Sequence, residues 1–324
     1  MYTSEEIVAF VKAQVENMNI KATPAGLYDP IRYVLSMGGK RIRPVLMLMA
    51  YNLYREDLER IVPLALGLET YHNYTLLHDD LMDHADLRRG KPTVHKKWNE
   101  NTAILSGDSM LVWAYSLMQQ APAEYLSAVL DLFTRTALEI GEGQQYDIDF
   151  EERQDVTEAE YIEMIRLKTS VLLACALKIG ALVGGAEARD AELLYQFGEK
   201  IGLAFQLQDD YLDVYGQSEK FGKKIGGDIL CNKKTYLLIK AFELSNEEQR
   251  RILKSWLDCK SYVAEEKINS VRAIYNEVGV PACCNEKIQA YFEEGLELLE
   301  EVALSETKKE NLKRFVLSLL NRDL

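Results

Sequence analysis

The pattern Asp-Asp-x-x-Asp occurs twice in this chain, each time at the end of an apolar helical run, and it constrains the fold more than any other feature. The copies lie in TLLHDDLMDHADLRRGKPT and, 130 residues later (209 − 79), in FQLQDDYLDVYG. Their aspartates are Asp79, Asp80 and Asp83, and Asp209, Asp210 and Asp213. On a helix, the first and last aspartate of each copy share one face, with the middle one beside them. Two unit charges ~4 Å apart at an effective dielectric of ~20 repel by about 4 kcal/mol, so these carboxylates do not gather for stability.

A hard divalent cation would remove this repulsion. Mg²⁺ typically takes one or two carboxylates and leaves its other positions to phosphates and water. Basic residues follow both copies: Arg88, Arg89 and Lys91 after the first, and Lys220, Lys223, Lys224, Lys233 and Lys234 after the second. One isolated copy is more often a solvated acidic helix end. Two copies, each with its own cations, indicate a diphosphate bridged by metal ions.

Composition narrows the class of protein. The 324 residues are 48% hydrophobic, enough for a large core, and no Pro-, Gly- or Ser-rich linker divides them. We therefore expect one domain over residues 1–324. The net charge of −13 argues against nucleic-acid and anionic-membrane partners.

The cellular location follows from cysteine usage and from the apolar segments. Five cysteines form no CxxC pair, and the N-terminal MYTSEEIVAF lacks the basic and apolar regions of a signal peptide. The longest apolar stretch, 171–186, contains Lys178 and is too short to span a bilayer. We expect a cytoplasmic protein without a membrane span.

Hydrophobic periodicity predicts helices almost throughout and no repeated strand pattern, so the fold class is all-α. Thr3 with Glu6, and Thr157 with Glu160, have capping-box spacing. The main predicted helices run from about residue 3 to 18, 24 to 37, 63 to 83, 102 to 120, 122 to 145, 157 onward and 188 to 215.

Two further groups of residues suggest ligand contacts. Gly38 and Gly39 allow close backbone approach beside Lys40 and Arg43, although this segment taken alone is better explained as a helix end with solvated charges. Lys168 lies among apolar residues, where it needs either a partner or a path to the surface.

From Gly38 to about Tyr236 the sequence closely resembles the trans-isoprenyl diphosphate synthases, the farnesyl and geranylgeranyl diphosphate synthase group. The resemblance rests on both Asp-Asp-x-x-Asp motifs and on the Gly-Gly-Lys segment. It implies a single large helical bundle of the isoprenoid synthase type around a deep central cavity, and usually a homodimer. The implied substrates are isopentenyl diphosphate and an allylic diphosphate (dimethylallyl, geranyl or farnesyl).

The resemblance also implies roles for individual residues. Both aspartate motifs and Asp147 would bind Mg²⁺, three ions with diphosphate bound. Gln144, which forms a polar pair with Asp147 near the metals, would contact substrate. Isopentenyl diphosphate would contact Gly39, Lys40, Arg43, His72 and Arg89. The allylic diphosphate would contact Arg88, Lys168, Lys233 and one or both of Lys223 and Lys224. Thr169 and Gln206 would face the developing cation, and with Arg88 and Lys168 they form the expected catalytic set.

These residue types suit the reaction that the resemblance implies. Metal ions and cations stabilise the diphosphate that leaves an allylic carbon. An apolar cavity keeps water from the carbocation. The double bond of isopentenyl diphosphate attacks, and the departed diphosphate would take the proton, so no side-chain base is needed.

The resemblance also implies what sets product length: in the family, the chain grows along the helix before the first motif, and bulk one turn before Asp79 acts as a floor. Tyr74 and Thr75 occupy these positions, and Tyr71 lies further up the same helix. A single aromatic five residues before an uninterrupted motif resembles the pattern of archaeal-type geranylgeranyl synthases. The resemblance therefore implies a farnesyl or geranylgeranyl product and argues against a long-chain polyprenyl product.

Two alternatives remain at this stage. A class I terpene cyclase has one aspartate-rich motif, a different second motif and no isopentenyl site. A non-catalytic partner subunit of a prenyl synthase usually loses motif carboxylates, whereas all six remain here.

Overall fold

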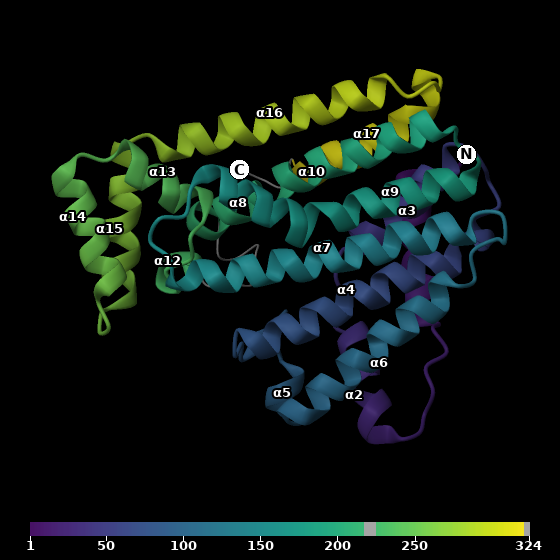
Figure 1. The fold of residues 1–324 in the computed structure, drawn as a ribbon, viewed down its shortest axis with the longest axis horizontal. Helices are drawn as coiled ribbons and strands as arrows, with labels where there is room; N and C mark the ends of the chain where they lie inside the picture. The colour runs from purple at the N-terminus through teal and green to yellow at the C-terminus, as the bar shows by residue number, and fades with distance from the viewer. Residues whose placement is uncertain (217–224, 321–324) are drawn as a thin grey trace. The chain divides into compact units, whose positions relative to one another are not determined.

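The protein, analysed as a computed structural model, is described over residues 1–216 and 225–320, and its regular structure is almost entirely helical (Figure 1). The all-α prediction is confirmed. Within the described residues, the strands are β1 (Leu87–Arg88) and β2 (Lys91–Pro92), a short antiparallel hairpin in which Arg88 pairs with Lys91. This hairpin lies in the basic segment directly after the first aspartate motif.

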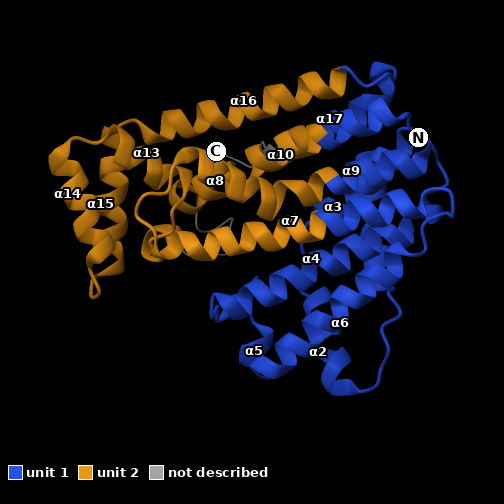
Figure 2. Ribbon diagram, viewed as in Figure 1, with its two compact units in different colours: residues 1–135, 175–195, 301–315 blue, residues 136–174, 196–300, 316–324 orange. Residues whose placement is uncertain are grey.

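The chain divides into two compact units, each assembled from separate segments (Figure 2). Unit 1 contains residues 1–135, 175–195 and 301–315, and unit 2 contains 136–174, 196–300 and 316–324. The first aspartate motif therefore belongs to unit 1 and the second to unit 2. A single domain over the whole chain stays a prediction.

Unit 1 is organised around α4, which carries the first motif. Its elements besides the hairpin are α1 (Ser4–Glu16), α2 (Ala25–Leu35), α3 (Ile42–Asn52), η1 (Leu58–Arg60), α4 (Val62–Met82), α5 (Val94–Lys97) and α6 (Glu100–Met118). α4 packs most extensively on α6, and a Cβ at Gly67 would lie 3.1 Å from the Ala114 carbonyl oxygen. An apolar cluster from α2, α4, α5 and α6 includes Ile31, Leu77 and Met110. This packing fixes the helix that ends at the motif.

Unit 2 carries the second motif near the end of α10. Its own elements are α8 (Glu158–Ile165), the π-helical turn η2 (Arg166–Ser170), α12 (Gly227–Leu230), α13 (Tyr236–Leu244), α14 (Glu247–Asp258), α15 (Ala264–Glu277) and α16 (Val280–Glu300). Four helices contribute residues to both units: α7 (Leu126–Glu152), α9 (Val171–Gly184), α10 (Ala188–Tyr215) and α17 (Glu306–Leu320).

Several predicted helix ends are confirmed. Thr3 and Glu6 form a capping box at the start of α1, as do Thr157 and Glu160 at the start of α8. The predicted helix over 188–215 coincides with α10.

The predicted end of the helix near Gln145 is wrong, because α7 continues to Glu152. Gly143 lies two residues before the predicted end and serves close packing inside the helix. A Cβ at Gly143 would lie 2.4 Å from the backbone nitrogen of Lys168, in η2. A glycine inside a helix is unfavourable unless such an approach requires it. The consequence is that Gln144 and Asp147 lie on a continuous helix.

Within residues 1–216 and 225–320, one helix is long and apolar enough to cross a membrane by length and composition. It runs from Glu158 to Gly184 through η2, with a mean hydropathy of 1.6 in its most apolar 18-residue window. Of that window, 78% is buried inside the protein, which is the behaviour of a core helix.

Two glycines on α7 give a test of this packing. Gly141→Ala should stabilise the protein by up to about 1 kcal/mol, because nothing lies within 4 Å of the new methyl group and alanine favours helix. Gly143→Ala should destabilise it by roughly 1–3 kcal/mol, because the methyl group meets the backbone of η2. Urea unfolding of both variants measures the difference. Equal effects at the two positions would show that η2 does not depend on this contact.

Candidate active site

The first aspartate motif lies at the C-terminal end of α4. Asp80 is buried, Asp79 is half-buried, and Asp83 is exposed at the cap of the helix. The backbone amide of Asp83 donates to the Asp79 carbonyl oxygen at 2.9 Å, so the helical spacing continues through the motif. The first and last carboxylates are therefore the more accessible ones, as the helical spacing predicts.

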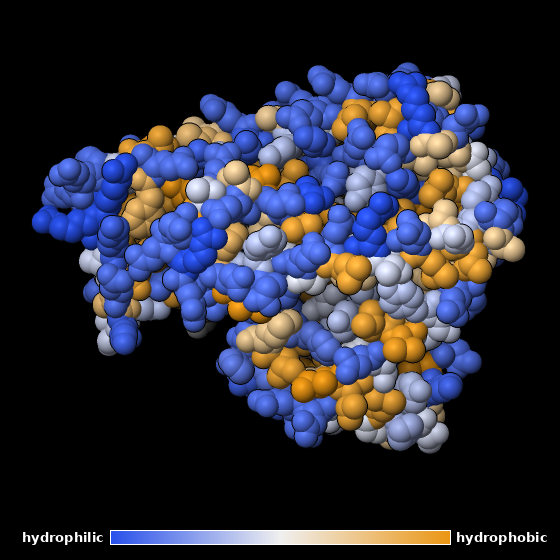
Figure 3. Space-filling view, in the orientation of Figure 1, coloured by the Kyte–Doolittle hydropathy of each residue, from blue (hydrophilic) through white to orange (hydrophobic). Residues whose placement is uncertain are grey.

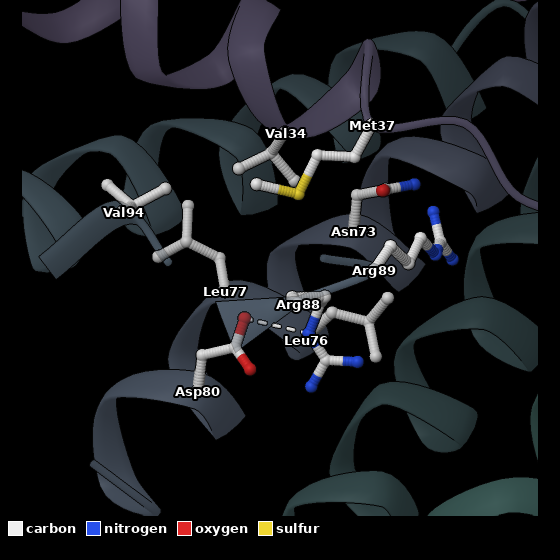
Figure 4. A pocket seen from close by; sticks show the side chains of 9 residues that line it. All are labelled: Val34, Met37, Asn73, Leu76, Leu77, Asp80, Arg88, Arg89 and Val94. Atoms are coloured by element: carbon white, nitrogen blue, oxygen red, sulfur yellow. Dashed lines mark hydrogen bonds and ion pairs between the residues drawn. The ribbon is translucent and has the colours of Figure 1, made fainter. Parts of the chain in front are cut away.

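Arg88 on the hairpin supplies a cation to this motif. Its Nε donates to Oδ2 of Asp80 at 2.7 Å (Figure 4). Its Nη2 lies 3.5 Å from Oδ2 of Asp79. Burial raises the pKa of Asp80, and the guanidinium of Arg88 opposes that rise. The role predicted for Arg88 was contact with the allylic diphosphate. In this structure it neutralises part of the motif.

The glycine-rich segment adopts the unusual backbone that its sequence suggests. Gly38 and Gly39 have φ of 81° and 123°, and a Cβ at Gly39 would lie only 2.7 Å from the guanidinium of Arg89. Arg89 donates to the Gly38 carbonyl oxygen, and Lys40 is exposed next to it. The structure thus brings together Gly39 and Arg89, two of the residues predicted to contact isopentenyl diphosphate.

Arg43 and His72 form a second contact of this region. Nη1 of Arg43 lies 3.0 Å from Nε2 of His72. Burial, followed by the charge of Arg43, lowers the pKa of His72 well below its usual value. The imidazole is therefore neutral near pH 7, and its Nε2 can accept a hydrogen bond from the guanidinium. Burial also lowers the pKa of Arg43 to about 10, which leaves it charged.

The sequence-based reasoning missed the residues that support this segment. Arg41 has a left-handed φ of 51° and forms a buried ion pair with Glu69, with Nη1 to Oε1 at 2.5 Å. It also donates to the Leu35 carbonyl oxygen. The signal was present, because Glu69 lies inside the buried apolar run of α4 and required a cationic partner.

The predicted chain-length residues lie on one stretch of α4. Tyr71 is buried, and its ring lies 5.5 Å from that of Tyr74 and 5.2 Å from that of Phe133. Tyr74 is half-buried against the apolar cluster and also contacts the ring of His78 at 4.8 Å. The hydroxyl of Thr75 donates a hydrogen bond to the His72 carbonyl oxygen at 2.8 Å.

The second aspartate motif, like the first, buries its middle aspartate. Asp210 is buried, Asp213 is half-buried and Asp209 is exposed. Asp210 accepts a hydrogen bond from the hydroxyl of Tyr161 and another, at 3.0 Å, from Nε2 of Gln206.

Thr169 extends this network. Its hydroxyl donates to Oε1 of Gln206 at 3.1 Å, so the two residues predicted to face the developing cation are in contact. Tyr161 was not predicted. Its position one turn into α8 carries no motif, and only the fold brings its hydroxyl to Asp210.

Lys168 has the partner that its apolar surroundings required. Its Nζ lies 2.6 Å from Oδ2 of Asp147, and η2 places it there from inside a continuous helix. Burial opposes ionisation of Asp147, but Lys233 and Lys168 outweigh it and hold the pKa of Asp147 below its usual value. Asp147 is therefore paired with lysines. Gln144 is half-buried one turn earlier on α7.

The segment after the second motif folds back onto it. The backbone amide of Asp228 donates to Oδ2 of Asp213 at 2.9 Å, and the carboxylate of Asp228 raises the pKa of Asp210. Lys233 acts on Asp210 in the opposite direction. Asp228 was also missed by the sequence analysis. Lys223 and Lys224 lie outside the described residues.

The donor set fits a hard divalent cation. Among the residues that the structure describes, no three histidine, cysteine, aspartate or glutamate side chains form a metal-binding group by themselves. Mg²⁺ does not need such a cage, because it usually takes one or two carboxylates and completes its shell with phosphate oxygens and water. Each motif presents two accessible carboxylates four residues apart.

Comparisons with known proteins agree with this chemistry. The family model for polyprenyl synthetase matches residues 24–278. The geranylgeranyl diphosphate synthase of Methanosarcina mazei is 43% identical over 235 residues, covering 72% of each chain. The farnesyl diphosphate synthase of Geobacillus stearothermophilus is 43% identical over 223 residues, covering 66% of this chain and 74% of that protein.

Solved structures are similar over almost the whole chain. A geranylgeranyl pyrophosphate synthase superposes with a TM-score of 0.95 at 43% identity, covering 99% of both chains. A polyprenyl synthase from Caulobacter crescentus, complexed with calcium and isoprenyl diphosphate, gives a TM-score of 0.86 at 27% identity, covering 99% of this chain and 96% of that one.

The buried aspartate of the second motif generates a pH prediction for the metal-free protein. Burial, then the charge of Asp228, raises the pKa of Asp210 to about 7, above its unfolded value of about 3.9. Between these values the folded protein holds a proton that the unfolded chain has released, so stability falls as the pH rises. Asp210→Asn cannot ionise. In EDTA it should gain on the order of 1–2 kcal/mol relative to wild type between pH 5 and pH 7.5.

Urea unfolding at the two pH values measures this gain. A difference between Asp210→Asn and wild type that is the same at pH 5 and pH 7.5 would show that Asp210 does not carry the proton.

Proposed function

The chain belongs to the polyprenyl synthetase family and is a prenyltransferase of the short-chain trans type, and from this premise we propose that it elongates an allylic diphosphate with isopentenyl diphosphate to farnesyl or geranylgeranyl diphosphate. One observation carries the assignment. Two Asp-Asp-x-x-Asp motifs each keep two accessible carboxylates and have basic side chains beside them. The preferred primer would be dimethylallyl, geranyl or farnesyl diphosphate.

The allylic diphosphate is assigned to the aspartate motifs and their cations. Asp79, Asp83, Asp209 and Asp213 would hold Mg²⁺, three ions in all with diphosphate bound. Bound Mg²⁺ neutralises the charge that grows on the leaving diphosphate. The resemblance to the family implies that Arg88 in unit 1, and Lys168 and Lys233 in unit 2, would contact diphosphate. Asp80 and Asp210, which are buried and already hydrogen-bonded, would keep the outer carboxylates in place.

Isopentenyl diphosphate is assigned to the segment where Gly39 meets Arg89 and Arg43 meets His72. The positive-φ glycines let the diphosphate approach the backbone, and Lys40 is exposed beside them. A neutral His72 can accept from Arg43 and hold the guanidinium in one orientation.

Thr169 and Gln206 are assigned to the carbocation. Their oxygens form a fixed hydrogen-bonded pair that could face positive charge without attacking it. The resemblance to the family implies that the departed diphosphate takes the proton, so no side-chain base is assigned.

The alternatives are not favoured. A terpene cyclase would not need the arginine and glycine segment at residues 38–43. A non-catalytic subunit would not need to retain all six motif aspartates.

A direct assay tests the function. The purified protein is incubated with isopentenyl diphosphate, each allylic primer in turn and Mg²⁺, and the products are sized by chromatography. Asp79→Ala or Asp209→Ala should lower turnover by at least about 100-fold with folding intact, because each removes a metal ligand. Asp131→Ala, at an exposed aspartate outside the motifs, is the matched control. Wild-type turnover in either motif variant would refute the two-motif mechanism.

We also propose that the protein is a homodimer. Unit 1 exposes apolar side chains on one side of α6, where Ile104, Leu105 and Val112 are 43%, 61% and 69% exposed. Apolar surface is visible over the part of Figure 3 where Figure 1 draws α6. Sedimentation equilibrium at a single chain mass would contradict a dimer.

A cytoplasmic location is proposed on separate grounds. All five cysteines are free thiols, as expected in a reducing compartment. Recovery of the enzyme in an oxidising compartment would contradict this location.

Tyr74 is proposed to set product length. It lies five residues before Asp79, about 7 Å along the helix axis at 1.5 Å per residue. Tyr74→Ala should open room for a longer chain, with each further buried methylene worth about 0.8 kcal/mol, and should shift the products to greater length. If Tyr74 were only a core aromatic, the variant would lose roughly 3–5 kcal/mol of stability and keep the same product.

Product chromatography decides between these outcomes. Tyr33→Ala is the matched control, because Tyr33 packs on the same apolar cluster without belonging to α4. A folded Tyr74→Ala enzyme whose products are no longer than those of wild type would rule out the floor.

A further inference from the structure

Lys267 on α15 is a buried lysine that the proposed chemistry does not use. It is 1% exposed. Its ammonium group donates to Oδ1 of Asn232 at 2.6 Å and to the Leu230 carbonyl oxygen at 3.4 Å, and it lies 4.3 Å from the ring centre of Tyr262. Among the described residues these partners are neutral oxygens and a ring. Burying an ammonium group is costly, so this arrangement requires a reason.

The partners of Lys267 belong to the turn that follows the second aspartate motif. Tyr262 donates to the same Leu230 carbonyl oxygen at 2.9 Å, and Nδ2 of Asn232 donates to the Leu257 carbonyl oxygen at 3.1 Å. Asn232 has a left-handed φ of 57°, a conformation that asparagine tolerates better than most residues. Lys267 therefore stabilises a turn with an unfavourable backbone.

This turn presents residues to the second motif. The amide of Asp228 donates to Oδ2 of Asp213 at 2.9 Å, and the amide of Lys233 donates to the Asp228 carbonyl oxygen at 2.9 Å. α15 also contacts the start of the turn, because a Cβ at Gly226 would lie 2.8 Å from Ile268. One helix thus supports the turn at both Gly226 and Asn232.

We propose that Lys267 is a positioning residue for the allylic-diphosphate part of the active site. By binding Asn232 and the Leu230 carbonyl oxygen, it sets the path of residues 226–235 and with it the placement of Lys233 beside the second motif. This inference rests on the proposed role of Lys233 and the second motif in binding the allylic diphosphate. Lys267 itself would not touch substrate.

The first experiment separates positioning from packing. Lys267→Met keeps an unbranched side chain of similar length but removes the ammonium group. We expect kcat/KM for the allylic diphosphate to fall about 10–100-fold, as is typical when a group that orients a binding residue is lost. KM for isopentenyl diphosphate should stay within about 2-fold of wild type, and Lys267→Arg should recover part of the loss.

A matched control removes a second buried lysine. Lys309 on α17 is 2% exposed and pairs with Glu306 at 2.7 Å. Lys309→Met should lower the melting temperature without changing either kinetic constant. If Lys267→Met behaved in the same way, with stability lost and both constants unchanged, its role would be structural and the proposal would be overturned.

Asn232 provides variants that fold even if Lys267→Met does not. Asn232→Gly keeps the left-handed backbone accessible but removes the acceptor, and Asn232→Ala removes both. Loss of allylic kcat/KM in both variants is expected. Loss in Asn232→Ala alone would show that the backbone conformation, and not the bond from Lys267, sets the turn, and would overturn the proposal.

A double-mutant cycle distinguishes failure of this inference from failure of the function on which it rests. Lys233→Met alone should lower allylic kcat/KM. If it does not, the role of Lys233 is wrong and the inference fails with it. If it does, Lys267→Met added to Lys233→Met should cost much less than Lys267→Met alone. Full additivity would show that Lys267 does not act through Lys233.

Discussion

Both aspartate motifs depend on the burial of one aspartate beside two that stay accessible. Asp80 and Asp210 are 5% and 4% exposed, whereas the first and last aspartate of each motif are half-buried or exposed. Successive residues of an α-helix are rotated by about 100° around its axis. The first and fifth residues of each motif therefore share one face, whereas the second residue points toward the core. The buried carboxylate would be unfavourable alone. Arg88 compensates Asp80, and Tyr161 and Gln206 compensate Asp210, so that each motif is anchored by the member least able to bind metal.

The same requirement explains the placement of the cations. Arg41 is buried against Glu69, and Lys168 pairs with Asp147. Arg41 itself has a left-handed backbone and follows the two glycines with positive φ. Lys168 lies in a π-helical turn that needs a glycine, Gly143, opposite it. Irregular backbone, meaning the left-handed residue and the π-helical turn, therefore occurs where ligand contacts are proposed. Glycine or a buried ion pair stabilises it in each case. Packing and function are not separate requirements at these residues.

Sequence reasoning could predict the features that repeat or follow a helical period. The capping boxes of α1 and α8, the extent of α10 and the accessible face of each motif all follow from local rules. It could not predict η2, because Arg-Leu-Lys-Thr-Ser contains no signal that distinguishes a π turn from an α turn. It ended this helix near Gln145, just after Gly143, because a glycine that terminates a helix and one that allows close packing look alike in sequence. Tyr161 and Asp228 were missed for a related reason: neither belongs to a motif, and only the folded chain brings them to the second aspartate set.

Local compensation of the motif carboxylates explains how a protein of net charge −13 can bind two diphosphates. At the first motif, Arg88 offsets one of three carboxylates, which leaves a formal charge of about −2, matched by one divalent ion. At the second motif, burial and the charge of Asp228 raise the pKa of Asp210, and Lys233 lowers it. The raised pKa lets the Asp210 carboxyl hold a proton in the absence of metal. Both motifs thus avoid a full triple negative charge before metal arrives, by a fixed guanidinium in one case and by a proton in the other. The consequence is an asymmetry: a guanidinium that stays charged at any physiological pH offsets the first motif, whereas the second depends on a proton that Asp210 loses as the pH rises.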